Sequence, residues 1–236
     1  MSDIATLIHL QEFDSRLAAI ETQLARLPKE IEALQAALGE ARKAAEAVRA
    51  RLDATRKELR AKERDLDDTA AKRSKSEARL YEVKTNAEYS AVLAEIEAIK
   101  ALKARTEEEI LVLMERQETL AGELRASEAR VAVVEEKTRR DEAVIRQKLG
   151  EVRQELEGVR GERTTLAREL PATLLADYER ILKARGGVAV AHVSSTHVCG
   201  GCRVTIRPQA IQELRQGQTL LNCESCGRYL YLREVA

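Results

Sequence analysis

A sustained heptad repeat is the feature that most constrains how this chain can fold. From Leu10 to Val83, apolar residues recur in alternating steps of three and four for about ten heptads, with Glu, Lys and Arg between them. A stripe this narrow is buried only against another helix of the same kind. This stripe, called here the first seam, contains Leu10, Phe13, Leu17, Ile20, Leu24, Leu27, Ile31, Leu34, Leu38, Ala41, Ala45, Val48, Leu52, Leu59, Leu66, Leu80 and Val83.

A second apolar repeat, the second seam, begins at Val92 and continues to Ile145 in a different register. Because the first seam, extended past Val83, would miss these positions by two residues, the helix must be interrupted between them. Thr85-Asn86-Ala87-Glu88 fits the gap as a capping box, in which Thr85 accepts from the N–H of Glu88 while Glu88 reaches back. We therefore predict an antiparallel coiled-coil hairpin over residues 1–170 with its tip near 84–88. A continuous helix that dimerises is the alternative.

The first seam becomes polar toward the predicted tip. One interpretation is a loosened end that opens onto a partner. The other is that a few polar residues fix the register and orientation of the two helices at some loss of stability. The polar positions are Thr55, Lys62, Thr69, Arg73 and Ser76.

The composition of the chain changes near residue 170. The whole chain is 34% charged and 3% aromatic, which is poor material for a broad globular core, and all four cysteines lie beyond residue 171. Pro171 can begin a helix that Gly186 and Gly187 end, so we predict a linker helix over 171–187. Residues 188–236 are predicted to form a small β-rich zinc ribbon. Its expected strands cover residues 188–193, 204–206, 220–221 and 229–232.

Two CxxC pairs predict a metal site in this ribbon. Their spacing is typical of a tetrahedral zinc site with four cysteine ligands, and Gly227 after the second pair can adopt the positive φ that such turns use. Four protein ligands leave no position for water, so we predict one structural Zn²⁺. A thioredoxin-like redox pair and a ligand role for His197 are the alternatives. The four ligands are Cys199, Cys202, Cys223 and Cys226.

Charge, hydropathy and motifs exclude several classes of function. Forty basic and forty acidic side chains cancel, which removes the simple argument for capture of nucleic acid or a membrane surface by the whole chain. The apolar stretches are too short to span a bilayer and the N-terminus does not resemble a signal peptide, so we expect a cytoplasmic protein. Without a phosphate loop, a nucleophile elbow or a HExxH helix, we expect no enzyme activity and no small-molecule substrate.

The chain resembles the bacterial family of coiled-coil hairpin proteins with a C-terminal four-cysteine zinc ribbon, of the chlamydial and the flagellar or secretion-associated types. Three segments carry the resemblance: YEVKTNAEYSAVLAEIE at 81–97, LPATLLADYERI at 170–181 and CESCGRYLY at 223–231. The resemblance implies the antiparallel hairpin and Zn²⁺ at the four cysteines. It also implies an adaptor or chaperone-like role toward secretion, flagellar or transcription components, with nucleic-acid binding often proposed.

Two functional hypotheses follow. The first is a scaffold that binds protein partners through the coiled-coil arm and the ribbon, with tip contacts at Tyr81, Asn86 and Tyr89. The second is a regulatory protein that binds nucleic acid through the ribbon, where arginines meet phosphates and tyrosines stack on bases. A strand face that packs the ribbon core is the alternative for the tyrosines. The candidate contacts are Arg203, Arg207, Arg215, Arg228, Arg233, Tyr229 and Tyr231.

Overall fold

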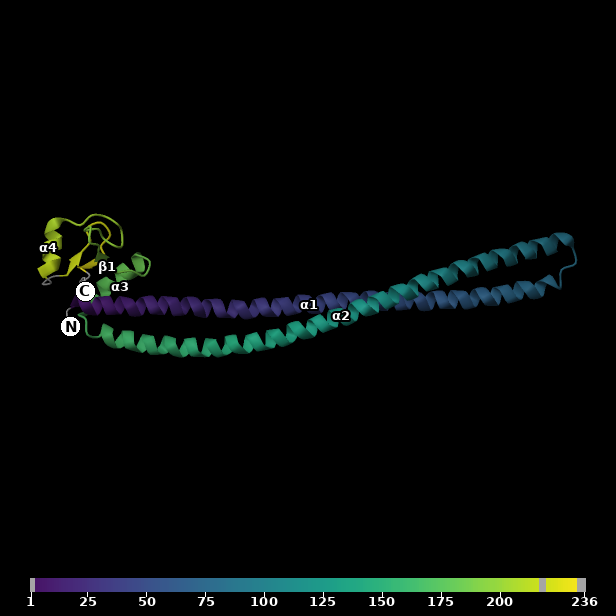
Figure 1. Cartoon of the computed structure of the whole chain (residues 1–236), viewed down its shortest axis with the longest axis horizontal. Coiled ribbons are helices and arrows are strands. Elements are labelled where there is room, and N and C mark those ends of the chain that lie inside the picture. The colour runs from purple at the N-terminus through teal and green to yellow at the C-terminus, as the bar shows by residue number, and fades with distance from the viewer. Residues whose placement is uncertain (1–2, 217–219, 233–236) are drawn as a thin grey trace. The chain divides into compact units, whose positions relative to one another are not determined.

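The computed structural model describes residues 3–216 and 220–232 and is mainly helical, with a small strand-containing region after the helices (Figure 1). Helices α1 and α2 run in opposite directions and are joined by one turn, which confirms the predicted antiparallel hairpin. The elements in chain order are α1 (Asp3–Leu80), α2 (Asn86–Ala167), α3 (Ala172–Ala184), β1 (Val190–Val193), α4 (Pro208–Gln216), β2 (Leu221–Asn222) and β3 (Tyr229–Leu232).

The chain divides into two compact units. Glu32–Glu142 forms the unit that contains the turn, and the other combines the hairpin base, from residues up to 31 and from 143 onward, with α3 and the ribbon. The domain boundaries expected after residues 170 and 187 stay predictions. No helix within the described residues is long and apolar enough to cross a membrane.

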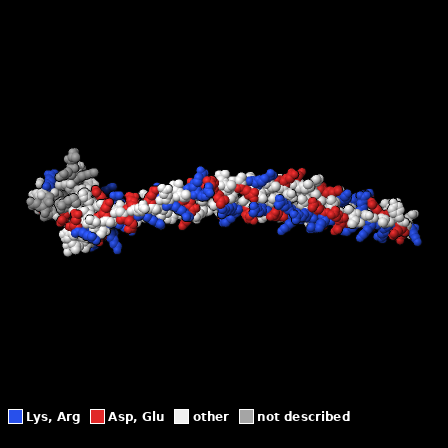
Figure 2. Space-filling model, turned by 90° about the horizontal axis from the view of Figure 1, so that it is seen from below, with Lys and Arg blue, Asp and Glu red and all other residues white. Residues whose placement is uncertain are grey.

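In the unit that contains the turn, the two seams pack against each other as an antiparallel pair. Leu52 and Leu120 are both almost fully buried. Ion pairs cross between the helices on either side of this level, from Arg49 to Glu128 at 2.8 Å and from Lys62 to Glu109 at 2.6 Å. Figure 2 shows acidic and basic side chains mixed along the helices, as such flanking pairs require.

The turn between α1 and α2 contains the predicted capping box. The N–H of Glu88 donates to Thr85 Oγ1 at 3.3 Å, and the N–H of Thr85 donates to Glu88 Oε2 at 3.2 Å. The same carboxylate oxygen accepts from the Thr85 hydroxyl at 2.9 Å. Two backbone N–H groups that a helix start leaves unpaired are thus satisfied without Gly or Pro.

The polar positions of the first seam form internal hydrogen bonds. Thr55, Thr69 and Ser76 are buried, and the two threonine hydroxyls donate to carbonyls one turn earlier in α1. Ser76 donates across to Glu95 at 3.1 Å, while Lys62 pairs across to Glu109. These cross-helix pairs favour the interpretation that polar residues fix the register.

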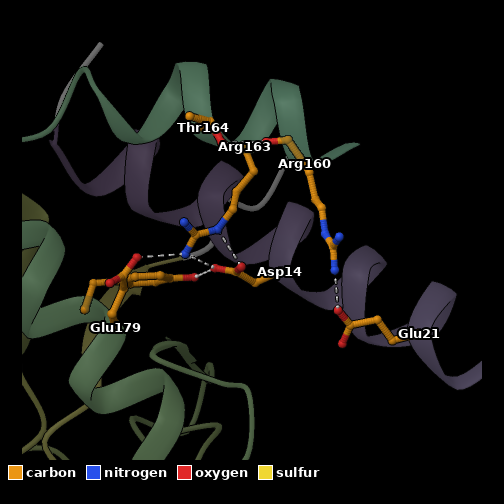
Figure 3. A network of polar contacts seen from close by, with 7 residues as sticks. Asp14, Glu21, Arg160, Arg163, Thr164 and Glu179 are labelled. Carbon is orange, nitrogen blue, oxygen red and sulfur yellow. Dashed lines mark hydrogen bonds and ion pairs between the residues drawn. The ribbon is translucent and has the colours of Figure 1, made fainter. Parts of the chain in front are cut away.

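In the other unit, α3 and the ribbon pack on the base of the hairpin. Asp14 of α1 accepts from Arg163 Nε of α2 at 2.8 Å and from the hydroxyl of the fully buried Tyr178 of α3 at 2.8 Å. Arg163 also donates to Glu179 at 3.2 Å (Figure 3). The apolar cluster around this junction contains Leu7, Leu10, Ala167, Leu170, Tyr178, Ile181, Ala189, Val190 and Tyr229.

The ribbon contains a three-stranded sheet in the order β1-β3-β2. β3 pairs parallel with β1 and antiparallel with β2. The strand predicted at 204–206 is wrong, because this segment makes only an isolated bridge between Val198 and Thr205. Helix α4, which the sequence analysis did not predict, follows it and buries Ile211 in the ribbon core.

Candidate zinc centre

The first cysteine pair lies in a tight turn pressed against β1. The N–H of Arg203 donates to the carbonyl of Cys199 at 2.8 Å, and the N–H of Gly200 donates to the carbonyl of His192 at 2.8 Å. A Cβ on Gly200 would lie 2.9 Å from that carbonyl oxygen and closer still to the His192 ring. Glycine is therefore needed here for a close approach between the turn and the strand.

The second cysteine pair forms the matching turn before β3. The N–H of Gly227 donates to the carbonyl of Cys223 at 2.7 Å, and the N–H of Cys223 donates to the carbonyl of Arg228 at 2.8 Å. Gly227 has a φ of 76°, in the left-handed region that favours glycine, as the sequence predicted.

The two turns bring the four sulfur atoms together. All four Sγ atoms lie within 4.8 Å of one another, with Cys199 Sγ 3.9 Å from Cys226 Sγ and Cys202 Sγ 3.6 Å from Cys223 Sγ. Four thiolates placed tetrahedrally about 2.3 Å from one Zn²⁺ would lie about 3.8 Å apart. The residues therefore fit one zinc ion with no ligand position left for water, which makes the zinc structural.

Burial and hydrogen bonding shift the pKa of three of the four thiols. Burial raises the pKa of the Cys223 thiol to about 12, and burial likewise raises the pKa of Cys199. At Cys226 burial again acts to raise the pKa, but hydrogen bonding with Arg228, Cys202 and Cys223 together outweighs it and the pKa falls to about 7. Since burial makes Cys199 and Cys223 resist ionisation, a divalent cation bound by all four sulfur atoms would stabilise them as thiolates.

The two alternatives for this motif lack structural support. Each cysteine faces a cysteine of the other CxxC pair, and no βαβ unit surrounds either pair in the described residues, as a thioredoxin-like site requires. His197 is exposed, adopts a φ of 61° and is not among the residues whose ligand atoms converge.

The arginines predicted to meet phosphates are placed differently from one another. Arg203 is exposed on the first turn. Arg207 is paired with Glu224. The guanidinium of Arg228 donates to the carbonyls of Val188 at 2.8 Å and Arg185 at 3.0 Å. Arg215 is exposed near the end of α4, and Arg233 lies outside the described residues.

The ribbon tyrosines share one face of β3, and that face packs inward. Tyr229 is 5% exposed, and its hydroxyl donates to Asp177 Oδ2 of α3 at 2.7 Å. Tyr231 is half-buried beside the same apolar cluster. The face thus contacts α3 and the hairpin base, which agrees with the packing alternative and leaves Tyr229 unable to stack on a base in this conformation.

The residues predicted as tip contacts are exposed. Tyr81 is 91% exposed and Tyr89 is 45% exposed, and Asn86 between them is exposed at the first position of α2. The capping box of Thr85 and Glu88 fixes the backbone between the two tyrosines.

The ribbon also has a groove, of about 370 Å³, bounded by α4, β2 and the second cysteine turn. Its walls combine apolar and charged groups, and the Arg207–Glu224 pair contributes to the lining. Sequence reasoning missed one residue that contacts the metal centre, Arg185, whose Nε donates to the carbonyl of Cys226 at 2.9 Å. Its position directly before Gly186 at a helix end was the available signal.

Comparisons with known proteins agree with this architecture. The model of the CT398-like coiled coil hairpin domain matches residues 10–186, and that of the C4-type zinc ribbon domain matches residues 198–230. The chain is similar in structure to CT398 from Chlamydia trachomatis, with 22% identity, a TM-score of 0.84 and 97% of each chain covered. None of the curated proteins matches it.

Two further solved structures are similar. The HP0958 protein from Helicobacter pylori CCUG 17874 has 17% identity and a TM-score of 0.59, with 98% of each chain covered. A protein from Mycobacterium smegmatis has 21% identity and a TM-score of 0.74, with 98% of this chain and 99% of that chain covered. At these identities the likeness shows the fold alone.

Proposed function

We propose that this chain, which belongs to the CT398-like coiled-coil hairpin family and carries a C4-type zinc ribbon, is a non-enzymatic adaptor or chaperone-like scaffold that binds protein partners. The turn of the hairpin and the ribbon are its two binding regions. Zinc shapes the ribbon and takes no part in a reaction, since its four ligands are all cysteines.

The exposed tyrosines of the turn carry this proposal. Of the five tyrosines in the chain, Tyr178 and Tyr229 are buried with bonded hydroxyls, whereas Tyr81 and Tyr89 are exposed beside one short turn. Aromatic side chains contribute strongly to binding energy at protein interfaces. A chain with 3% aromatic residues that exposes two of them on a capped turn has the features of a docking surface.

The family resemblance supports components of secretion, flagellar or transcription systems as the class of partner. Use of all four cysteines as metal ligands supports a reducing compartment, and we place the protein in the cytoplasm on that basis.

The test is affinity capture with the zinc-loaded full-length chain, comparing wild type with the double variant Tyr81→Ser and Tyr89→Ser. The matched control is Val133→Ser and Val144→Ser, which removes two other exposed apolar side chains from α2, 70% and 66% exposed. We expect at least one partner to be lost from the tyrosine variant and kept by the control. Identical sets of captured proteins from all three chains would contradict binding through the turn.

Nucleic-acid binding through the ribbon is the second candidate, and exposed Arg203 is the observation that favours it. Against it, Arg207 is paired with Glu224 and the Arg228 guanidinium binds carbonyls, which leaves Arg203 and Arg215 to offset the negative charge of a zinc tetrathiolate. This candidate predicts retention of single-stranded RNA by the full-length chain that weakens with salt and is abolished by Arg203→Glu. Absence of retention at low salt rejects it.

A further inference from the structure

Two arginines exchange hydrogen bonds between the end of α3 and the second cysteine turn. Arg185, at the C-cap of α3, donates from Nε to the carbonyl of Cys226 at 2.9 Å. In return, Arg228 donates to the carbonyl of Arg185 at 3.0 Å and to that of Val188 at 2.8 Å. The last carbonyls of a helix lack intrahelical partners and carry partial negative charge, so a guanidinium is well suited to them.

The side chain of Arg228 also passes directly over the first cysteine turn. A Cβ on Gly201 would lie 2.6 Å from Cδ of Arg228 and 2.9 Å from one of its terminal nitrogens. Gly201 therefore leaves the space that the guanidinium crosses on its way to α3. Arg228 thus contacts both cysteine turns and the end of the linker helix.

The contacts continue from Arg228 to the base of the hairpin. The next residue, Tyr229, donates from its N–H to the carbonyl of Ala189 at 2.8 Å and from its hydroxyl to Asp177 of α3. Tyr229 belongs to the apolar cluster that includes Leu7 and Leu10 of α1. Every step of this path lies within one compact unit.

We infer that Arg228 is a positioning residue that couples zinc binding at the four cysteines to the seating of the ribbon on α3. Zinc fixes both cysteine turns, and the turns place the Cys226 carbonyl and the Arg228 guanidinium opposite the end of α3. Without zinc the turns lose this geometry, and the carbonyls of Arg185 and Val188 lose their donor. Because coupling free energies are reciprocal, loss of the Arg228 contact also weakens zinc retention.

Zinc retention is the first readout. Zinc-loaded full-length Arg228→Met keeps the aliphatic stem and removes the donors. It is mixed with a chromogenic chelator, and the zinc that the chelator takes from it is compared with the zinc taken from wild type. Loss of a residue that orients metal ligands weakens metal affinity by about 10- to 100-fold, and we expect a change in that range. The control Arg215→Met removes an exposed ribbon arginine and is expected to retain zinc like wild type.

Hydrogen exchange at the end of α3 is the second readout, because a general loss of ribbon stability would not single it out. The N–H of Arg185 donates to Ile181 and that of Gly187 donates to Leu182, both at 2.9 Å. We expect zinc removal from wild type to speed exchange of these two amides, and zinc-loaded Arg228→Met to show the same increase. Exchange in α1 around Leu52 should not change in either case.

Two further variants keep the inference testable if Arg228→Met does not fold. Arg185→Met removes only the bond to Cys226, and Gly201→Ala pushes on the Arg228 side chain while every arginine remains. Both should release zinc faster than wild type. In a folded double variant with Arg228→Met, Gly201→Ala should increase the rate of zinc release little further, because both changes act on the same contact. Wild-type zinc retention in Arg185→Met, or unchanged α3 exchange on zinc removal, overturns the inference.

Discussion

The side chain of Gln11 is hydrogen-bonded to the backbone of Val190, which joins α1 to the edge strand of the ribbon sheet. Gln11 Nε2 donates to the carbonyl of Val190 at 2.8 Å, and Gln11 Oε1 accepts from the N–H groups of Ala189 at 2.7 Å and Val190 at 2.6 Å. On the side of β1 that faces away from β3, this amide side chain pairs with Val190, while the first cysteine turn pairs with His192 and Val193. The ribbon is therefore attached to the hairpin base by backbone recognition as well as by apolar packing.

Gln11→Ala should loosen the ribbon from the hairpin base. Ala189 and Val190 are almost fully buried, so their N–H groups would lose a partner at about 1–3 kcal/mol. Exchange of the Val190 amide should rise about tenfold or more, measured by hydrogen exchange of the zinc-loaded chain. Gln23→Ala, at an exposed position of α1, is the control and should leave it unchanged. An equal rise in Val190 amide exchange in both variants would mean that a general weakening of α1 is the cause.

Asp14→Ala should destabilise the junction of α1, α2 and α3 by about 2–3 kcal/mol, because the buried Tyr178 hydroxyl loses its acceptor and the Arg163 guanidinium keeps only Glu179. Figure 3 contains the matched control, the more exposed Arg160–Glu21 pair at 3.2 Å. Glu21→Ala removes that pair and should change stability by less than about 1 kcal/mol. Chemical denaturation of the zinc-loaded chains measures both. Similar losses of unfolding free energy in the two variants would show that the Asp14 network stabilises the fold no more than an exposed ion pair does.

The hairpin could be predicted from sequence because its determinants are local and periodic. The disagreement in register between Val83 and Val92 located the turn, and the capping box of Thr85 and Glu88 forms as predicted. The zinc ligands could be predicted for the same reason, since two CxxC turns with a glycine after the second define their geometry almost by themselves.

The parts that the sequence did not reveal depend on contacts between distant residues. Tyr229 and Tyr231 alternate as an exposed stacking face would, and it is packing against α3 and the hairpin base that buries this face. Arg228 resembles a phosphate contact until its carbonyl partners near α3 are known. Helix α4 is short, and Pro208 at its first position was the one local signal for it.

Acid should fray the start of α2 through Glu88. Hydrogen bonds from the Thr85 hydroxyl, then from the backbone of Thr85 and Lys84, lower the pKa of Glu88 below its usual value. A carboxyl with a lowered folded-state pKa stabilises fully above its unfolded pKa of about 4.3, and the contribution disappears as the pH falls through the folded value. An NMR titration should therefore place the pKa of Glu88 below the ordinary value of about 4.3 for a glutamate, and Glu88→Gln should remove the pH dependence of the Ala87 and Glu88 amides. A Glu88 pKa at or above that ordinary value would contradict the bonding at the turn.

Replacement of the metal should report the ligand set directly. Co²⁺ bound to four thiolates gives intense sulfur-to-metal charge-transfer bands and the visible bands of a tetrahedral ion, and we expect one equivalent to produce both. Cys226→Ser should weaken the charge-transfer bands and lower the affinity, because one thiolate is lost. His197→Asn, which suits the positive φ at that position, should leave the spectrum unchanged if no histidine is a ligand.

Removal of the metal should unfold the ribbon while most of the helical circular dichroism remains, because the two seams of α1 and α2 are buried against each other without any contact to the cysteines. Loss of most of the helical signal with the metal would show instead that the hairpin depends on the ribbon for its folding.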